Sequence, residues 1–431
     1  MTPYHYLPIQ NILSFLADKE PFALLETTRV DSQNLLSYIF FEPDGKIEIN
    51  NYSDLPLFFN QIESLLLSGY YLAGFFSYEA GNSFNVGAPS TCPPKPWQMR
   101  TAPAGSMNQA ATVIRSPSSP FPLACFYLFR NPLIFDHQSG LFTGGSLPEE
   151  SGSPKNYTLK NPLLTVGFTE YQKNVRRIKE LIAAGDTYQV NYTLKCKFNF
   201  SGSSFGLYRD LRERQTVAYS AFIKDRDFSL LSFSPELFFR KSGRKITVRP
   251  MKGTIGRGKD ACRDKQQIQL LEQSPKERSE NVMIVDLLRS DLGRVSEVGT
   301  VRTDSLFDIE EYETLFQMTS TISGILKENL SFGDLFEAIF PSGSVTGAPK
   351  IRTMEIIREL EKEERAVYTG AVGVFFPNRD AIFNVAIRTM TITGAEGEMG
   401  IGGGITFGSD ARQEYDECKL KALFLTDTAN S

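Results

Sequence analysis

The sequence predicts an α+β fold, in which helices pack on antiparallel β-sheets, and three observations carry this prediction. Residues 188–196 alternate strictly between two faces, as a β-strand does. Residues 169–185, just before them, show the periodicity of an amphipathic helix. Along the chain, strands and helices alternate less regularly than in a βαβ array, so a mixed layered fold is favoured over a Rossmann fold.

The limits and faces of this helix and strand follow from individual residues. Thr169 and Gln172 fit a capping box at the helix start, and Gly185 fits the helix end. The apolar stripe of the helix consists of Tyr171, Val175, Ile178 and Ile182. One face of the strand carries Tyr188, Val190, Tyr192, Leu194 and Cys196, and the other carries Gln189, Asn191, Thr193 and Lys195. The strand therefore has an apolar face and a polar face.

Further strands and helices are predicted toward the C-terminus. Residues 228–250 predict additional strands with a turn at Ser242-Gly243, because two apolar runs flank that dipeptide. Helices are expected at residues 275–289, 349–361 and 411–424. These elements follow one another in the mixed order that an α+β fold requires.

A change in composition suggests two regions. Residues 101–120 are small and polar and predict a surface loop. Residues 144–154 consist mainly of Gly, Ser and Pro, which is typical of a linker. We therefore place a boundary near 145–163, between an N-terminal region (1–150) and a second region (164–425).

The composition excludes several classes of function. Lys plus Arg number 46 and Asp plus Glu number 50, which gives a formal charge of −4 and argues against binding nucleic acid or an anionic membrane. The only histidines are His5 and His137. A histidine-dependent triad or a His-rich metal site would have to use these two. Acid–base chemistry is therefore expected to depend on Lys, Glu, Asp or Tyr.

Cysteine usage and hydropathy indicate the compartment. The five cysteines are scattered and form no C-x-x-C pair, which argues against a disulfide framework and a structural zinc site. The first residues do not resemble a signal peptide, and no apolar run approaches the ~18 residues that span a membrane. We expect a soluble cytoplasmic protein.

Two Glu-x-x-Glu pairs lie on predicted helices. Glu277 and Glu280 follow the helix start Ser274-Pro275, and Glu414 and Glu417 lie near the C-terminus. Carboxylates at this spacing share a helix face and repel one another unless a cation binds. Oxygen ligands without histidine suit Mg²⁺. The alternative is that both pairs form solvated acidic faces.

Three glycine-rich segments could approach a ligand closely. Residues 341–350 lead into a helix whose free N–H groups would attract an anion, and residues 400–404 expose bare backbone. Both segments are also compatible with ordinary tight turns. Residues 253–260 nearly match a phosphate-binding loop, but Asp260 replaces the Ser or Thr that would bind Mg²⁺, which argues against a nucleotide site.

Several longer motifs lie between about residues 165 and 425. They are Ser234-Pro235-Glu236, residues 249–254 (RPMKGT), 280–287 (ENVMIVDL), 340–350 (FPSGSVTGAPK), 400–405 (GIGGGI) and 414–417 (EYDE). In sequence and in order, these motifs resemble those of the chorismate-utilising enzymes. The resemblance implies a fold of orthogonal β-sheets in a sandwich, flanked by helices. Leu24-Leu25-Glu26-Thr27 is similar to the N-terminal region that holds the tryptophan feedback site in anthranilate synthases.

The resemblance also implies a site in which Mg²⁺ lies between the ring carboxylate of chorismate and acidic side chains. The metal ligands would be Glu280 and Glu417, supported by Glu277 and Glu414. The substrate carboxylates would be held by Tyr368, Arg388 and Lys421. The rest of the pocket would be formed by Thr346 and the backbone of Gly402, Gly403 and Gly404.

Two positions separate the members of the family. Gln189 stands where the water-adding members carry a lysine, which favours ammonia as the nucleophile. Lys252 stands where anthranilate synthases have alanine, and a lysine there resembles the members that aminate chorismate at C4. A lone lysine at a strand end would otherwise be read as solvated. By this resemblance Lys252 attacks C2 while Glu236 protonates the departing C4 hydroxyl, and ammonia from a glutamine amidotransferase partner then adds at C4.

One position departs from the family. Gln317 stands where a histidine is expected, and an amide can form hydrogen bonds but cannot titrate near neutrality. This departure keeps open a catalytically inactive subunit that only binds chorismate. An anthranilate-forming member is a second alternative, because motif matches can mislead.

Overall fold

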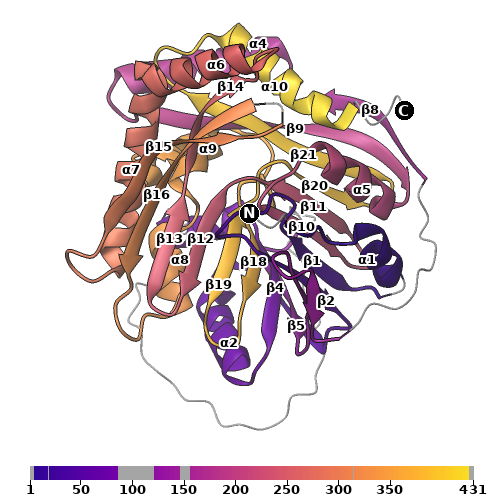
Figure 1. The fold of residues 1–431 in the computed structure, drawn as a ribbon. Helices are drawn as coiled ribbons and strands as arrows, with labels where there is room; N and C mark the ends of the chain where they lie inside the picture. Colours follow the sequence, from indigo (N-terminus) through magenta and orange to yellow (C-terminus); the bar gives the residue numbers. More distant parts are fainter. Residues whose placement is uncertain (1–3, 18, 86–120, 146–155, 314, 427–431) are drawn as a thin grey trace.

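Two large antiparallel sheets form the centre of the protein in a computed structural model (Figure 1). The structure describes residues 4–17, 19–85, 121–145, 156–313 and 315–426. The first sheet has eleven strands in the order β17-β9-β21-β20-β11-β10-β1-β2-β6-β7, with β8 beside β9. The second has ten strands in the order β14-β16-β13-β12-β19-β18-β4-β5-β3, with β15 beside β16. The predicted α+β class is confirmed.

The strands have the following limits. The first sheet contains β1 (Phe22–Glu26), β2 (Leu36–Phe41), β6 (Leu133–Asp136), β7 (Leu141–Thr143), β8 (Tyr157–Leu164), β9 (Gln189–Gly202), β10 (Tyr219–Lys224), β11 (Ser229–Ser234), β17 (Gly347–Ala348), β20 (Thr389–Thr393) and β21 (Glu396–Ile405). The second contains β3 (Gly45–Ile49), β4 (Tyr71–Phe76), β5 (Ala124–Phe129), β12 (Leu237–Ser242), β13 (Lys245–Arg249), β14 (Met251–Gly256), β15 (Arg302–Glu311), β16 (Leu315–Ile325), β18 (Ala371–Phe375) and β19 (Ala381–Val385).

The helices lie at the flanks of these sheets. They are α1 (Ile9–Leu16), α2 (Leu55–Leu67), α3 (Asn82–Asn85), α4 (Phe168–Ala183), α5 (Ser204–Arg214), α6 (Ala261–Gln273), α7 (Pro275–Val295), α8 (Phe332–Ile339), α9 (Lys350–Leu360) and α10 (Ala411–Thr426), with short 3₁₀ turns at Tyr52–Asp54, Tyr78–Gly81 and Gly343–Val345. In Figure 1, α7 runs along β15 and β16, while α4, α6 and α10 gather at one end of the molecule. No helix in the described ranges is long and apolar enough to cross a membrane.

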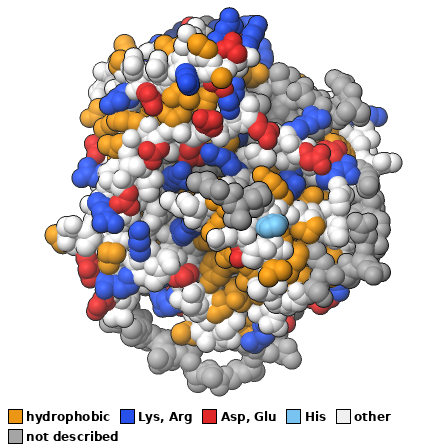
Figure 2. Space-filling view, viewed as in Figure 1, with side chains coloured by type: hydrophobic (Ala, Val, Ile, Leu, Met, Phe, Trp, Pro, Cys, Tyr) orange, Lys and Arg blue, Asp and Glu red, His pale blue; other side chains and the backbone are white. Residues whose placement is uncertain are grey.

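The core has three main parts. One buried cluster lies between the sheets, where side chains of β1, β2 and β10 meet those of β4, β5 and β18. Two larger clusters bury the apolar faces of the helices against the two sheets. Such burial stabilises the fold by roughly 25 cal/mol per Å² of apolar surface. On the face shown in Figure 2, acidic and basic side chains are mixed, as expected from the small net charge.

The predicted first helix is present as α4, but its start was wrongly assigned. The helix begins at Phe168 with Gly167 as the N-cap, and none of the described side chains caps it. Thr169 therefore lies inside the first turn and cannot form the capping box. The helix begins two residues earlier than that capping box would place it, and the Phe168 ring packs against Tyr415, with ring centroids 5.5 Å apart. Gly185, at φ +83°, follows the helix end as predicted.

The alternating strand is present as β9, which extends to Gly202. Its polar face is buried near the start, at Gln189, Asn191 and Thr193, so both faces are covered there. Tyr188 instead precedes the strand and is 70% exposed. The burial of a polar face marks this end of β9 as part of a site.

The later elements match the prediction closely. Strands β11, β12 and β13 occupy residues 228–250, and Gly243 takes φ +55° in the turn. Ser274 caps α7 through the backbone N–H of Glu277, with Pro275 in the first turn. This helix extends past the expected residue 289 because Leu292 and Val295 are also buried. Helix α9 begins at Lys350.

The division into two regions near 145–163 stays a prediction. The expected loop at 101–120 lies outside the described residues, as does most of the expected linker at 144–154. Strand β1 pairs with β10, and β4 pairs with β18, so both sheets contain strands from each side of the boundary.

Candidate active site

Gln189, Lys252 and the glycine strand of β21 meet at one point. A Cβ atom built on Gly404 would lie 2.4 Å from Nε2 of Gln189 and 3.1 Å from Nζ of Lys252. The two side chains therefore converge over bare backbone, and only glycine leaves room for them. Gln189 comes from the start of β9 and Lys252 from β14, so this point joins the two sheets.

Beyond Met399, one edge of β21 pairs with no strand among the described residues. Strand β21 pairs with β9 as far as Ile405, but its pairing with β20 ends at Met399. On the side facing α10, Lys421 Nζ donates to the carbonyl of Gly402 at 2.8 Å. A Cβ atom on Gly403 would lie 3.5 Å from Oε2 of Glu414. The predicted pocket residues 402–404 thus lie between the Lys252 side chain and helix α10.

Gln189 is fully buried, yet its amide has no partner among the residues that the structure describes. Within these residues neither Oε1 nor Nε2 forms a hydrogen bond, while the backbone of Gln189 is held by the ladder with β17. Leaving a buried amide unpaired is costly unless a ligand or water satisfies it. This side chain is the strongest indication of a ligand at this point.

Glu236 is a buried acid whose backbone is firmly held. Its N–H donates to Ser234 Oγ at 3.2 Å, and its carbonyl accepts from Val385 N at 3.0 Å. Oε1 has no partner. Burial raises the pKa of Glu236 to about 7, although a hydrogen bond from Ser344 and the charge of Lys252 oppose this rise. A carboxyl group of this kind can give and take a proton near neutral pH.

The pKa of Lys252 is shifted in the direction that a nucleophilic amine needs. Burial lowers the pKa of its ammonium group, and the charges of Glu280 and Glu236 partly oppose that effect. A larger neutral fraction makes the amine a better nucleophile. The two groups therefore have environments that suit an acid and an amine working side by side.

The four glutamates lie on two helices that face the same region. Burial raises the pKa of Glu277, and the charges of Glu280 and Glu417 raise it further. Burial also raises the pKa of Glu414, and Glu417 adds to this effect. The carboxylates of α7 thus repel those of α10, as expected around a site that binds a cation.

These glutamates suit a metal ion by their ligand chemistry, but the described side chains are not arranged as a ready coordination shell. Within the described ranges no three His, Cys, Asp or Glu side chains are grouped closely enough to hold a metal ion. Glu417 instead pairs with Lys421 at 2.7 Å. The donors are all carboxylate oxygens, which suit Mg²⁺. The magnesium site stays a prediction.

The remaining predicted substrate residues are held by other partners. The Thr346 hydroxyl donates to the carbonyl of Ser342 at 3.1 Å. Arg388 donates to Gln215 at 3.0 Å, and burial lowers the pKa of its guanidinium. The ring of Tyr368 covers Gly400, where a Cβ atom would lie 2.0 Å from it, and burial raises the pKa of its hydroxyl. Lys252 and Gln189 thus share the space over Gly404, whereas these three side chains contact other groups.

The position where a histidine was expected is occupied by a hydrogen-bonded amide. Gln317 Nε2 donates to the carbonyl of Gly253 at 2.8 Å, and the Thr254 hydroxyl donates to Gln317 Oε1 at 2.8 Å. The ring of His137 is buried between Ser37 Oγ and the carbonyl of His5, at 2.8 and 2.7 Å. This ring belongs to the packing of the N-terminal region.

Two groups of site residues were not predicted from the sequence. One is Ser344, the partner of Glu236, which lies within the matched 340–350 motif. The other is the buried pair Glu361 and Arg365, which fixes the backbone of Thr193, Asn191 and Val345 beside the site. The charged run around residues 361–365 gives no signal of burial in the sequence.

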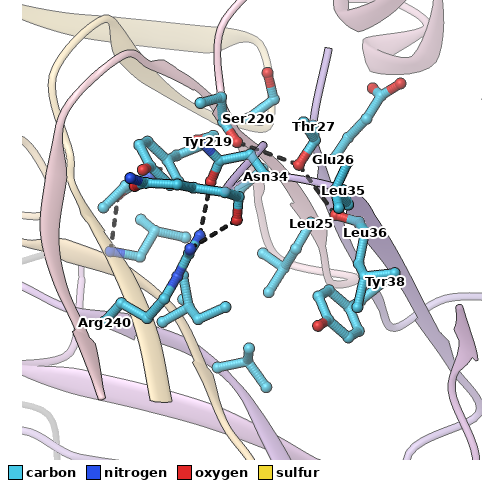
Figure 3. A pocket seen from close by; sticks show the side chains of 18 of the residues that line it. Leu25, Glu26, Thr27, Asn34, Leu35, Leu36, Tyr38, Tyr219, Ser220 and Arg240 are labelled. Carbon is cyan, nitrogen blue, oxygen red and sulfur yellow. Dashed lines mark hydrogen bonds between the residues drawn. The ribbon is translucent and has the colours of Figure 1, made fainter. Parts of the chain in front are cut away.

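A separate cavity of about 410 Å³ lies between the two sheets. Its walls come from β1, β2 and β10 on one side and from β12, β18 and β19 on the other. Arg240 donates to Asn34 Oδ1 and to the carbonyl of Gln33, both at 2.7 Å (Figure 3). Glu26 also borders the cavity, and its carboxylate binds Arg212 and Tyr208. The stretch that resembles the tryptophan region of anthranilate synthases therefore borders a cavity.

Comparison with known proteins identifies the class to which this fold and site belong. The sequence model of a family described as "chorismate binding enzyme" matches residues 23–427. The chain belongs to this family.

Curated proteins of similar sequence show which members of the family the chain is similar to. The chain is 41% identical to aminodeoxychorismate synthase component 1 of Bacillus subtilis over 258 residues, or 59% of this chain and 55% of that protein. It is 38% identical to the Escherichia coli protein of the same name over 250 residues, with 58% and 55% covered. An anthranilate synthase component I-like protein of Synechocystis is 34% identical over 323 residues, covering 71% and 66%. The chain thus spans about half the length of the first two relatives.

Solved structures confirm the fold. Anthranilate synthase component I from Streptococcus pneumoniae superposes with a TM-score of 0.72 at 23% identity, covering 91% of this chain and 94% of that one. The isochorismate synthase MenF from Escherichia coli gives 0.73 at 16% identity, covering 97% and 91%. The fold expected from the resemblance to chorismate-utilising enzymes is therefore present.

Proposed function

We propose that the chain is the large subunit of an aminodeoxychorismate synthase. In this role it aminates chorismate at C4 with ammonia and forms 4-amino-4-deoxychorismate, the precursor of p-aminobenzoate in folate synthesis. The observation that supports this proposal best is the meeting of Lys252 with Gln189 over Gly404, beside the buried acid Glu236. The curated relatives in two bacteria carry the same activity in their names.

The geometry suits a two-stage displacement. The neutral amine of Lys252 forms a bond to C2, the two ring double bonds shift, and the C4–O bond breaks. Glu236 gives its proton to the departing hydroxyl, because hydroxide is a poor leaving group. Ammonia then forms a bond to C4, the double bonds shift back, and the bond from C2 to Lys252 breaks. Glu236 accepts the proton that the added ammonia loses.

Other residues hold the substrate and the metal in this proposal. Glu280 and Glu417, supported by Glu277 and Glu414, would hold Mg²⁺, which neutralises the ring carboxylate. The free edge of residues 402–404 and the Lys421 ammonium would bind a carboxylate of chorismate. Gln189 offers an amide rather than a second amine, so it cannot activate water as a base.

A glutamine amidotransferase subunit is the proposed source of ammonia, and the name "component 1" of the relatives agrees with a second subunit. The cytoplasm is the proposed location, because the described cysteines Cys125, Cys196, Cys262 and Cys418 are all free.

A product assay tests the proposal. The purified chain is incubated with chorismate, ammonium and Mg²⁺, and the intact product is identified by mass spectrometry. We expect 4-amino-4-deoxychorismate and its loss when EDTA removes Mg²⁺. Anthranilate as the main product would replace the proposal with an anthranilate synthase. Calorimetric binding of chorismate without turnover would indicate the inactive binding subunit.

A further inference from the structure

The strand that carries Lys252 contains a β-bulge next to that lysine. Between Met251 and Thr254, β14 advances three residues while the paired residues of β16 advance two. The extra residue interrupts the ladder of backbone hydrogen bonds. Gly253, at φ +92°, takes the left-handed conformation that the bulge needs. The direction of the Lys252 side chain therefore depends on what holds this bulge.

One side chain of β16 forms hydrogen bonds with the bulged segment. The amide of Gln317 donates to the carbonyl of Gly253 and accepts from the hydroxyl of Thr254, each at 2.8 Å. Gln317 is only 8% exposed, so both of its bonds are shielded from water. A single amide thus forms hydrogen bonds with both residues that follow Lys252.

The same strand ties the bulge to the acidic helix α7. On the other side of the bulge, Ser320 N donates to the carbonyl of Pro250 at 3.2 Å, and Ser320 Oγ donates to Asn281 Oδ1 at 2.6 Å. Asn281 lies on α7, next to the predicted metal ligands. A Cβ atom on Gly253 would lie 3.1 Å from Oε2 of Glu277. A movement of the bulge would therefore change the distance between Lys252 and this helix.

We propose that Gln317 is a positioning residue, which fixes the bulge through Gly253 and Thr254 and thereby directs Lys252 toward its reaction partner. This inference rests on the proposed function for the role of Lys252, but the clamp is a property of the two strands. The requirement is one donor and one acceptor at a fixed distance. A neutral histidine meets the same requirement, whereas an apolar side chain of equal length does not.

Kinetics of matched variants test the clamp. Gln317→Met keeps the length of the side chain and removes both bonds, and Thr254→Val removes one. We expect Gln317→Met to lower kcat by on the order of 10²-fold, with a much smaller change in KM, because a shift of about 1 Å in a reacting group has effects of that size. Gln317→His and Thr254→Ser should restore most of kcat at pH 8. Equal kcat in Gln317→Met and the wild type would overturn the proposal.

A second measurement does not depend on the reaction. Trinitrobenzenesulfonate labels lysine amines, and peptide mass spectrometry gives the labelling rate at Lys252. We expect faster labelling in Gln317→Met and a rate close to that of the wild type in Gln317→His. Thr321→Val, on the same strand, is the control and should change neither kcat nor the labelling rate at Lys252. If the chain makes no aminodeoxychorismate, the labelling still tests the clamp, and identical labelling in all variants would refute it.

Discussion

Lys252 and Glu236 are two ionisable residues whose usual charges oppose the roles proposed for them. An ordinary lysine is a cation at neutral pH and cannot attack carbon, and an ordinary glutamate has no proton to give. Burial shifts the pKa of each group toward its neutral form, downward for Lys252 and upward to about 7 for Glu236. The same physical cause thus prepares both the nucleophile and the acid.

Lys252→Ala removes the proposed nucleophile. The variant should lose amination at C4 by on the order of 10³-fold or more, because the covalent route requires the amine. Activity is measured as 4-amino-4-deoxychorismate formed per enzyme at saturating ammonium. Lys173→Ala, on the exposed face of α4, is the control and should retain full activity. Unchanged product formation by Lys252→Ala would contradict the covalent role.

The second residue-scale prediction concerns the stability cost of Glu236. Its folded-state pKa of about 7 lies above the ordinary value of 4.5, so folding favours the protonated form. The stability present below pH 4.5 is therefore lost as the pH rises through 7, by about 3 kcal/mol at most for a shift of this size. Glu236→Gln removes this loss and should be more stable than the wild type at pH 8 but not at pH 4. The measurement is urea denaturation at both pH values, and a pH-independent difference would count against the shifted pKa.

At the scale of elements, the glycine strand β21 sets how closely Gln189 and Lys252 can approach the backbone. Gly404→Ala would place a methyl group 2.4 Å from the amide of Gln189, so that side chain must move. We expect kcat/KM to fall at least about tenfold, since small displacements of reacting groups are costly. Gly408→Ala is the matched control, because no atom of the described residues lies within 4 Å of its Cβ position. Similar kinetics for both variants would show that the convergence over Gly404 has no role in catalysis.

The sequence allowed prediction of elements where a local pattern decides the structure. The strand at β9, the turn at Gly243 and the start of α7 at Ser274-Pro275 all depend on neighbouring residues. The start of α4 was wrong, because a distant contact with Tyr415 favours an earlier beginning. The hydrogen bonds of Ser344 and Gln317 were beyond prediction for a similar reason: each residue bonds to one more than sixty positions away, and such contacts leave no periodic signal.

At the scale of the whole molecule, the N-terminal strands complete both sheets. Strand β1 lies between β2 and β10, and β4 lies between β5 and β18. The cluster between the sheets contains Phe40 and Phe75 from the N-terminal part together with Ile223 and Val374 from the rest. Without its N-terminal strands, the region that carries the candidate site would expose the edges of β10 and β18 and one wall of this core.

The last prediction follows from this arrangement. A fragment of residues 164–425 contains every proposed catalytic and metal-binding residue, yet we expect it to aggregate or to unfold without a cooperative transition, because unpaired strand edges and exposed apolar faces are destabilising. The full chain should unfold in one transition. The measurements are thermal denaturation by circular dichroism and binding of a hydrophobic dye, with the full chain as the control. A fragment that unfolds cooperatively and binds chorismate would show that the site folds independently of the N-terminal strands.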